Sequence, residues 1–154
     1  MSDTTIRIAR REDVPTIVAL LADDPLGRRR ETNSDPPPPA YWQAFDDIAG
    51  QTGNFLLVAE RGSAVAGCLQ LTVIPGLSRR GTKRGLIEAV RVAAAYRGQG
   101  VGEALVRHAI EIARAEGCGL VQLTSDKSRP DAHRFYERIG FVASHVGMKL
   151  SLDG

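Results

Sequence analysis

The stretch from residue 86 to 116 constrains the fold of this chain most. Leu86–Val92 alternates as a β-strand does, and Val101–Glu116 repeats at helical spacing. Between them, the turn Arg97–Gly102 has glycine at every second position, 98, 100 and 102. Glycines in such a turn leave backbone N–H groups free to point at an anion, and the helix start behind them adds partial positive charge. The sequence therefore predicts a strand–turn–helix unit that binds a phosphate-bearing ligand.

The spacing of these glycines narrows the class of ligand. A nucleotide-binding P-loop ends in Lys-Ser or Lys-Thr, and neither follows the glycines here. A dinucleotide-binding fingerprint has the spacing G-x-G-x-x-G, but the third glycine arrives one residue early and Glu103 stands in its place. The remaining pattern is R-x-x-G-x-G between a strand and a helix. A tight connection without any ligand is the alternative interpretation of this segment.

Two segments of the chain resemble the GCN5-related N-acetyltransferase (GNAT) superfamily. The R-x-x-G-x-G turn is similar to the acetyl-CoA-binding motif of that family. Asp131–Phe141, with the sequence DAHRFYERIGF, is similar to its A-x-x-F-Y-E-x-x-G-F segment. The resemblance covers the chain from about Ile6 to its end. It implies an α/β (α+β) fold, in which about four helices flank a mixed, mostly antiparallel sheet of six to seven strands, with one parallel strand pair splayed to admit acyl-CoA.

The resemblance also implies which residues bind acetyl-CoA, the expected co-substrate. The residues of the glycine turn are expected to hold its diphosphate: Arg97, Gly98, Gln99, Gly100, Val101 and Gly102. The backbone of Val90, Arg91 and Val92 is expected to meet the thioester and the pantetheine arm. Arg129 and His133 are further candidate contacts. The chain departs from the family pattern at Arg129, where many relatives have an asparagine.

Two side chains are candidates for proton transfer during acetyl transfer. The resemblance implies that Tyr136 protonates the departing thiolate, a role that suits a phenol with a pKa of about 10. Glu88 is the first candidate for the general base, because the two-residue period of a strand places it on one face with Val90 and Val92, opening onto the cleft. The alternatives are a core tyrosine and a salt-bridged glutamate. His133 or a water relay is the other candidate base.

The predicted function is an N-acetyltransferase that transfers the acetyl group of acetyl-CoA to a primary amine of a small molecule, by direct attack in a ternary complex. One alternative is a protein or peptide acetyltransferase acting on a lysine or an N-terminus. Another is a non-catalytic acyl-CoA-binding regulatory module, since a fold does not fix a function. The candidate contacts to the acceptor are Asp23, Asp24, Glu31, Tyr41 and Trp42. The alternative is that these residues are helix caps, loop charges and core aromatics. The paired acids among them hint at a cationic acceptor.

Length and composition limit the class of protein. With 154 residues, 43% of them apolar and 25% charged, the chain reads as one globular acyltransferase domain spanning 1–154. A net charge of +2, with no basic run interleaved with aromatics, argues against a nucleic-acid partner. No apolar segment suits a membrane span or a signal peptide, so a cytoplasmic protein is expected. The cysteines and histidines share no metal-ligand spacing, so no metal is expected.

Periodicity predicts the remaining elements. Helices are expected over 11–24, 41–49 and 130–139, and strands over 5–10, 54–60, 64–74 and 120–124. Phe141–Leu152 reads as two closing strands around Gly147. A homodimer is a further expectation, because the resembled family often dimerises and these closing strands could pair across subunits.

Overall fold

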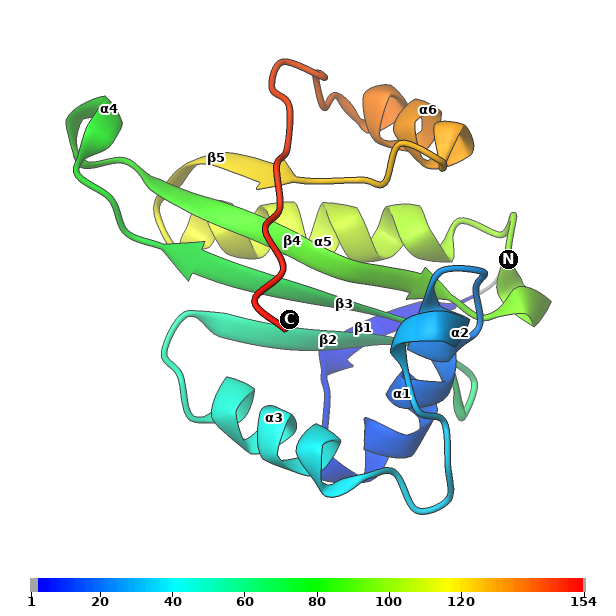
Figure 1. Cartoon of the computed structure of the whole chain (residues 1–154). Helices are drawn as coiled ribbons and strands as arrows, with labels where there is room; N and C mark the ends of the chain where they lie inside the picture. Colours follow the sequence, from blue (N-terminus) through cyan, green and yellow to red (C-terminus); the bar gives the residue numbers. More distant parts are fainter. Residues whose placement is uncertain (1–2, 154) are drawn as a thin grey trace.

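The computed structural model describes residues 3–153, and its centre is one five-stranded sheet in the order β1-β2-β3-β4-β5 (Figure 1). Its strands are β1 (Thr4–Ile8), β2 (Asn54–Arg61), β3 (Ala64–Ile74), β4 (Lys83–Val92) and β5 (Cys118–Leu123). The first four pair antiparallel, and β5 runs parallel to β4. The mixed, mostly antiparallel sheet is therefore confirmed. The expected count of six to seven strands is wrong, since the described residues form five.

Six helices accompany the sheet within residues 3–153. They are α1 (Val14–Ala22), α2 (Gly27–Arg30), α3 (Pro39–Ala49), α4 (Ser78–Gly81), α5 (Val101–Ala115) and α6 (Pro130–Ile139). Two 3₁₀ turns, η1 (Arg11–Asp13) and η2 (Ala94–Tyr96), precede α1 and the glycine turn. Since α2 and α4 are single turns of four residues, the four longer helices match the number expected from the sequence.

The larger core lies between α5 and one face of the sheet. The apolar stripe of α5 is buried, including Val101 in its first turn and Leu105 in its second, and it packs against Leu69, Leu71 and Ile87. Burial of each such side chain stabilises the fold by about 1.5–3 kcal/mol. Because Val101 is buried directly behind the glycine turn, packing of α5 also fixes where that turn stands.

The opposite face of the sheet is covered by α1 and α3, whose Ile17, Leu20 and Phe45 pack with Val58 and Cys68. At the start of this unit, the buried carboxylate of Asp13 accepts two hydrogen bonds from Arg7, at 2.7 and 3.0 Å, and one from the Arg10 amide at 2.7 Å. Charge-assisted bidentate pairs of this kind hold orientation well. They aim α1 so that its end lies above the last residues of β4.

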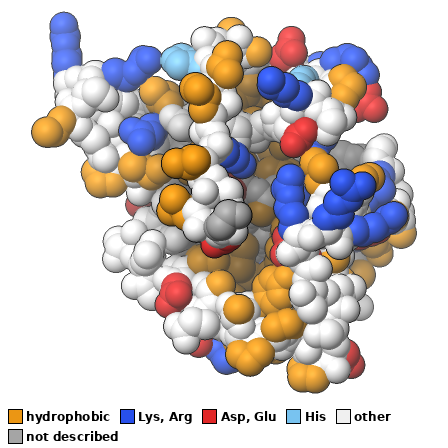
Figure 2. All heavy atoms as spheres, in the orientation of Figure 1, with side chains coloured by type: hydrophobic (Ala, Val, Ile, Leu, Met, Phe, Trp, Pro, Cys, Tyr) orange, Lys and Arg blue, Asp and Glu red, His pale blue; other side chains and the backbone are white. Residues whose placement is uncertain are grey.

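The C-terminal segment differs from its prediction. No closing strands form: after Phe141, which packs on the core, residues 142–153 are exposed and without regular structure. Val146, Met148 and Leu150 alternate with polar or small residues as a strand would, yet each is at least 82% exposed. In Figure 1 this segment runs from α6 in the foreground of the sheet, and Figure 2 shows apolar side chains gathered along it. The strand pattern is present, but within residues 3–153 no strand pairs with this segment.

Candidate active site

The two parallel strands separate part-way along β4. Their pairing runs from Lys83 opposite Cys118 to Ile87 opposite Leu123, where β5 ends. Residues 88–92 of β4 continue without a partner on that side. Backbone N–H and C=O groups are obligatory hydrogen-bonding groups, so this edge can accept an extended ligand arm as a further strand-like neighbour. The separation expected from the GNAT resemblance is therefore present.

A β-bulge lies at the point of separation. Ala89 has φ of +55°, and the register with β3 shifts there, from Gln70 opposite Glu88 to Cys68 opposite Arg91. Three residues of β4 thus span the length of two on β3. Positive φ is unfavourable for a residue with a Cβ, and bulges of this kind re-aim side chains beside active sites.

The bulge changes which side chains share a face. Val90 and Val92 pack on the core beneath α5, whereas Glu88 lies opposite Gln70, whose neighbours on β3 point into that core. Glu88 therefore faces the other side of the sheet, and the prediction that it shares a face with the two valines is wrong. The extra residue in β4 reverses the two-residue period, and a sequence pattern does not reveal it. Glu88 is exposed, on the α1 side of the sheet.

The glycine turn forms the end of this opening. Gly98 and Gly100 have φ of +76° and +83°, and a Cβ built on either would meet no atom within 4 Å. Gly100 caps the N-terminus of α5, whose first amides have no intrahelical partner. These open positions and unpaired donors fit a diphosphate at the helix start. Behind the turn, Arg61 Nη2 donates to Gln99 Oε1 at 3.0 Å and fixes its shape.

Tyr136 lies on α6, which begins at Pro130 and ends before Gly140 as the sequence predicts. Its ring is partly buried and makes edge contacts with Phe135 and Phe141, at centroid distances of 5.0 and 5.8 Å. Burial raises the pKa of the phenol above its usual value, while the positive charges of Arg91 and Arg129 act to lower it. The group is therefore protonated at neutral pH and can donate a proton.

Asp24, between α1 and α2, joins residues that are far apart in the sequence. Its Oδ1 accepts a hydrogen bond from Arg129 Nη2 at 2.9 Å, and its Oδ2 lies 3.2 Å from Arg91 Nε. Burial acts to raise the pKa of Asp24, but hydrogen bonds from the Leu26 and Gly27 amides and the two guanidinium charges outweigh it, so the pKa is lowered. Nothing in the sequence signals this cluster, because 105 residues separate Asp24 from Arg129.

Asp23, next to Asp24, is also paired with an arginine. Asp23 Oδ2 lies 3.7 Å from Arg97 Nη2, and Arg97 Nε also donates to Val92 O at 3.2 Å. A pocket of about 340 Å³ lies here, and its charged lining consists of Asp23, Asp24, Arg28, Arg91, Arg97 and Arg129. Four arginines against two aspartates leave this pocket positive, so the paired acids give no support to a cationic acceptor.

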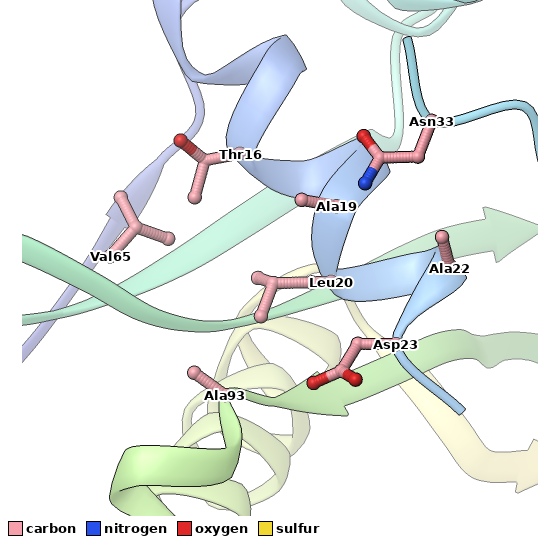
Figure 3. Close-up of a pocket in the computed structure, with 8 residues that line it drawn as sticks. All are labelled: Thr16, Ala19, Leu20, Ala22, Asp23, Asn33, Val65 and Ala93. Carbon is pink, nitrogen blue, oxygen red and sulfur yellow. The ribbon is translucent and has the colours of Figure 1, made fainter.

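A second pocket of about 410 Å³ adjoins the first and shares Asp23 with it. Figure 3 shows its lining, which comes from α1, the loops after α1 and α2, the start of β3 and the residue after β4: Thr16, Ala19, Leu20, Ala22, Asp23, Asn33, Val65 and Ala93. Its walls are small apolar side chains, with the polar ends of Thr16, Asp23 and Asn33 around them. The two pockets together have the size of a small-molecule site.

Other candidate residues make local structural contacts. The imidazole Nε2 of His133 lies 3.0 Å from the Asp126 carbonyl, within the turn that leads into α6. Tyr41 donates to Glu31 Oε1 at 2.8 Å, and Trp42 Nε1 donates to the backbone at 3.2 Å. The contacts of Tyr41 and Trp42 hold the loop after α2 in place. They favour a structural role for Glu31, Tyr41 and Trp42 over a role in acceptor binding.

Residues 3–153 contain neither a metal-binding cluster nor a membrane-spanning helix. No group of three or more His, Cys, Asp or Glu side chains is placed to hold a metal ion among them. No helix in this part of the chain has the length and apolar character to cross a bilayer.

Comparison with known proteins identifies the family. Residues 15–141 match the model of the acetyltransferase (GNAT) family. The chain belongs to this family. It is 34% identical over 130 residues to glucosamine 6-phosphate N-acetyltransferase 1 of rice, an alignment covering 81% of this chain and 77% of the rice protein. It is 42% identical over 89 residues to glucosamine 6-phosphate N-acetyltransferase of Trypanosoma brucei brucei, covering 57% of this chain and 58% of that protein.

Solved structures share the fold of this chain. This GNAT chain superposes with a TM-score of 0.95 on a structure described as a transcriptional regulator from Bacillus halodurans C-125, which is 49% identical, with coverage of 97% of this chain and 100% of that one. More distant structures of the same fold, at 13% and 18% identity, were solved with CoA and with acetyl-CoA. The GNAT family, to which the chain belongs, is a family of acetyltransferases.

Proposed function

We propose that the chain is an acetyl-CoA-dependent N-acetyltransferase that acetylates the primary amine of a small molecule. The observation that carries this proposal is the separation of β4 from β5 after Ile87, with the glycine turn at the far end of the unpaired edge. An unpaired strand edge suits an amide-containing arm, and free amides at a helix start suit its diphosphate. Together they form a continuous seat for acetyl-CoA.

Different backbone groups of the chain would bind different parts of acetyl-CoA. The amides of Gly98–Gly102 would hold the diphosphate, and the backbone of Val90, Arg91 and Val92 would hold the pantetheine arm and polarise the thioester carbonyl. Bound acetyl-CoA supplies the acetyl group as a thioester. Burial of Val90 and Val92 on the α5 core fixes this edge, so the donors are oriented before the ligand arrives.

Two groups would move protons in a ternary complex. Tyr136, kept protonated by burial, would donate its proton to the leaving sulfur. Glu88, exposed on the α1 side of the sheet where the acceptor would approach, would remove the proton of the attacking amine, directly or through a water. His133 is a weaker candidate for this role because its Nε2 contacts a backbone carbonyl.

The acceptor we propose is an amine that also carries an anionic group. In the pocket beside β4, Arg91 and Arg97 border the proposed acetyl-CoA seat, whereas Arg28 comes from α2. Arg29 and Arg30 follow Arg28 on α2, and all three side chains are exposed, so they give this end of the site a positive field that would attract an anionic group. The relatives from rice and T. brucei are named for an amino sugar phosphate, which has this combination of groups.

We further propose that the C-terminal segment pairs with a second copy of the chain. Val146, Met148, Leu150 and Leu152 are all more than 80% exposed and alternate as one face of a strand. β5 has β4 as its only sheet neighbour in the described structure, so its other edge is open. Pairing between two copies would bury these side chains and satisfy both sets of backbone groups.

A non-catalytic regulatory module remains a second candidate function, because the 49% identical protein of B. halodurans is described as a transcriptional regulator. The two functions differ in turnover and agree in cofactor binding. Release of free thiol from acetyl-CoA should be measured over amino sugar phosphates, the matching sugars without phosphate, polyamines and lysine peptides. Release with the phosphorylated amines supports the proposal, whereas tight acetyl-CoA binding without release from any acceptor supports the regulatory module.

A further inference from the structure

Asp24 connects the three elements that border the opening beside β4. It follows α1, and it contacts Arg91 on β4 and Arg129 immediately before α6, the helix that carries Tyr136. The Asp24 side chain is only 12% exposed, and those of Arg91 and Arg129 are 18% and 29% exposed. The cluster is therefore largely shielded from water. Solvent and salt screen ion pairs in such a place much less than ion pairs at the surface.

The structure around Asp24 leaves its carboxylate little freedom. The Leu26 amide donates to Asp24 Oδ1 at 2.9 Å, and the chain folds so closely at Gly27 that an added Cβ would lie 1.9 Å from the Leu21 carbonyl and 2.8 Å from Asp24 Oδ2. Arg91 has a second anchor, because its Nη1 donates to Val90 O at 2.9 Å. Both partners of this ion pair are therefore held in place.

The cluster is not built for ideal pairing. Asp24 Oδ2 and Arg91 Nε face each other at 3.2 Å, yet both are buried atoms without an aligned hydrogen bond. At this distance the opposite charges still attract each other, so the carboxylate keeps the Arg91 guanidinium beside it. Tyr136 packs on the same core as Val90 and Val92, which flank Arg91 on β4, and Arg129 directly precedes the helix that carries Tyr136. The positive charges of both arginines act to lower the pKa of the phenol.

We propose that Asp24 is a positioning residue, which holds Arg91 and Arg129 where their charges stabilise the phenolate that Tyr136 becomes after giving up its proton. This inference rests on the function proposed above. In that reaction the amine nitrogen bonds to the acetyl carbon, and the carbon–sulfur bond breaks with its electron pair going to sulfur. Tyr136 transfers its phenolic proton to that sulfur and keeps the O–H electron pair. The proton that the amine loses, taken by Glu88 or water, restores the phenol.

The direct test measures the phenol itself and needs no turnover. The chain has three tyrosines, so the double variant Tyr41→Phe/Tyr96→Phe leaves Tyr136 as the only phenol whose ionisation absorbs in the ultraviolet. In that background Arg129→Gln should raise the Tyr136 pKa by roughly one unit. Arg138→Gln, on the same helix, removes an equal charge and should leave the pKa unchanged. Equal pKa values in the parent and in Arg129→Gln would overturn the proposal.

A kinetic test separates positioning from fold maintenance. Asp24→Asn should lower kcat roughly tenfold, since the arginines lose their anchor, with the KM for acetyl-CoA changed less than about threefold. Arg129→Lys should retain more of kcat than Arg129→Gln, because it keeps the charge; equal loss in both variants would contradict the role of charge. If Asp24→Asn fails to fold, the Arg129 pair still decides. A parent without turnover would refute the proposed function and leave the titration result standing.

Discussion

The close approach of β3 to the bulged part of β4 makes Gly67→Ala the sharpest structural test. Gly67 lies opposite Val92, and a Cβ at this position would stand 2.7 Å from the Arg91 carbonyl oxygen. It would also lie 3.1 Å from Leu105 Cδ1 and 3.2 Å from Val101 Cγ1. An ordinary carbon–oxygen contact is about 3.3 Å, so the β4 backbone at Arg91 must move by roughly 0.6 Å.

Two opposing effects set how much Gly67→Ala changes the free energy of unfolding. Overpacking a well-filled core costs about 1–3 kcal/mol. Alanine is better than glycine inside a strand by roughly 0.5–1 kcal/mol. The free energy of unfolding of Gly67→Ala should therefore fall by about 0.5–2 kcal/mol, as measured by urea denaturation. Acetyl-CoA affinity, measured by calorimetry, should fall as well, because a shift of the backbone at Arg91 also moves Val90 and Val92, whose backbone is proposed to hold the pantetheine arm.

Gly102→Ala is the matched control for stability. A Cβ at Gly102 would lie 3.4 Å from Val92 Cγ2 and 3.5 Å from Phe135 Cζ, which are ordinary contacts. Because alanine favours a helix over glycine, this variant should be more stable by about 0.5–1 kcal/mol. Should Gly67→Ala match the wild type in both stability and acetyl-CoA binding, the close packing of β3 on β4 would not be what shapes the site.

Four further results are expected. Tyr136→Phe should slow turnover by roughly 10²–10⁴ while acetyl-CoA still binds, and an unchanged rate would remove the phenol from the mechanism. Ala89→Val should destabilise the fold by about 1–2 kcal/mol relative to Ala89→Gly in urea denaturation, since a β-branched residue tolerates positive φ poorly; equal stability would argue against the bulge. The pKa of Asp13 is lowered below its unfolded value near 3.9, chiefly by the hydrogen bond from Arg7, so the stability that this pair adds should be fully present above about pH 4 and be lost as pH falls through the folded-state pKa. Asp13→Asn should therefore reduce the loss of stability at acid pH. The same loss in wild type and variant would count against the pair. Leu150→Lys should convert a dimer to a monomer in light scattering, and a wild-type monomer at high concentration would refute C-terminal pairing.

Most of the fold follows from local sequence patterns. The helix over 130–139 and the strand over 64–74 form at their predicted bounds, and the helix predicted at 101–116 ends one residue earlier. The spacing of apolar residues and the glycines and prolines at the ends are enough to predict these elements, because each is stabilised by burial of one face. The glycine turn is also predicted, since positive φ at Gly98 and Gly100 demands glycine.

The two failures concern information that a local pattern lacks. The bulge at Ala89 places Glu88 on the opposite face from the valines that follow, and alanine carries no signal for positive φ. The alternation from Val146 to Leu152 is typical of a strand, but no strand forms there, because a local pattern does not say where a partner edge is found. The Asp24 cluster depends on contacts between distant residues and is visible only in the folded chain.

The most direct test of the central claim is a crystal structure of the full chain with acetyl-CoA. We predict that the diphosphate contacts the amides of Gly98–Gly102 and that the thioester lies between residues 88–92 of β4 and the Tyr136 hydroxyl. Acetyl-CoA bound elsewhere, or a β5 that stays paired with β4 beyond Ile87 and closes the opening, would contradict it.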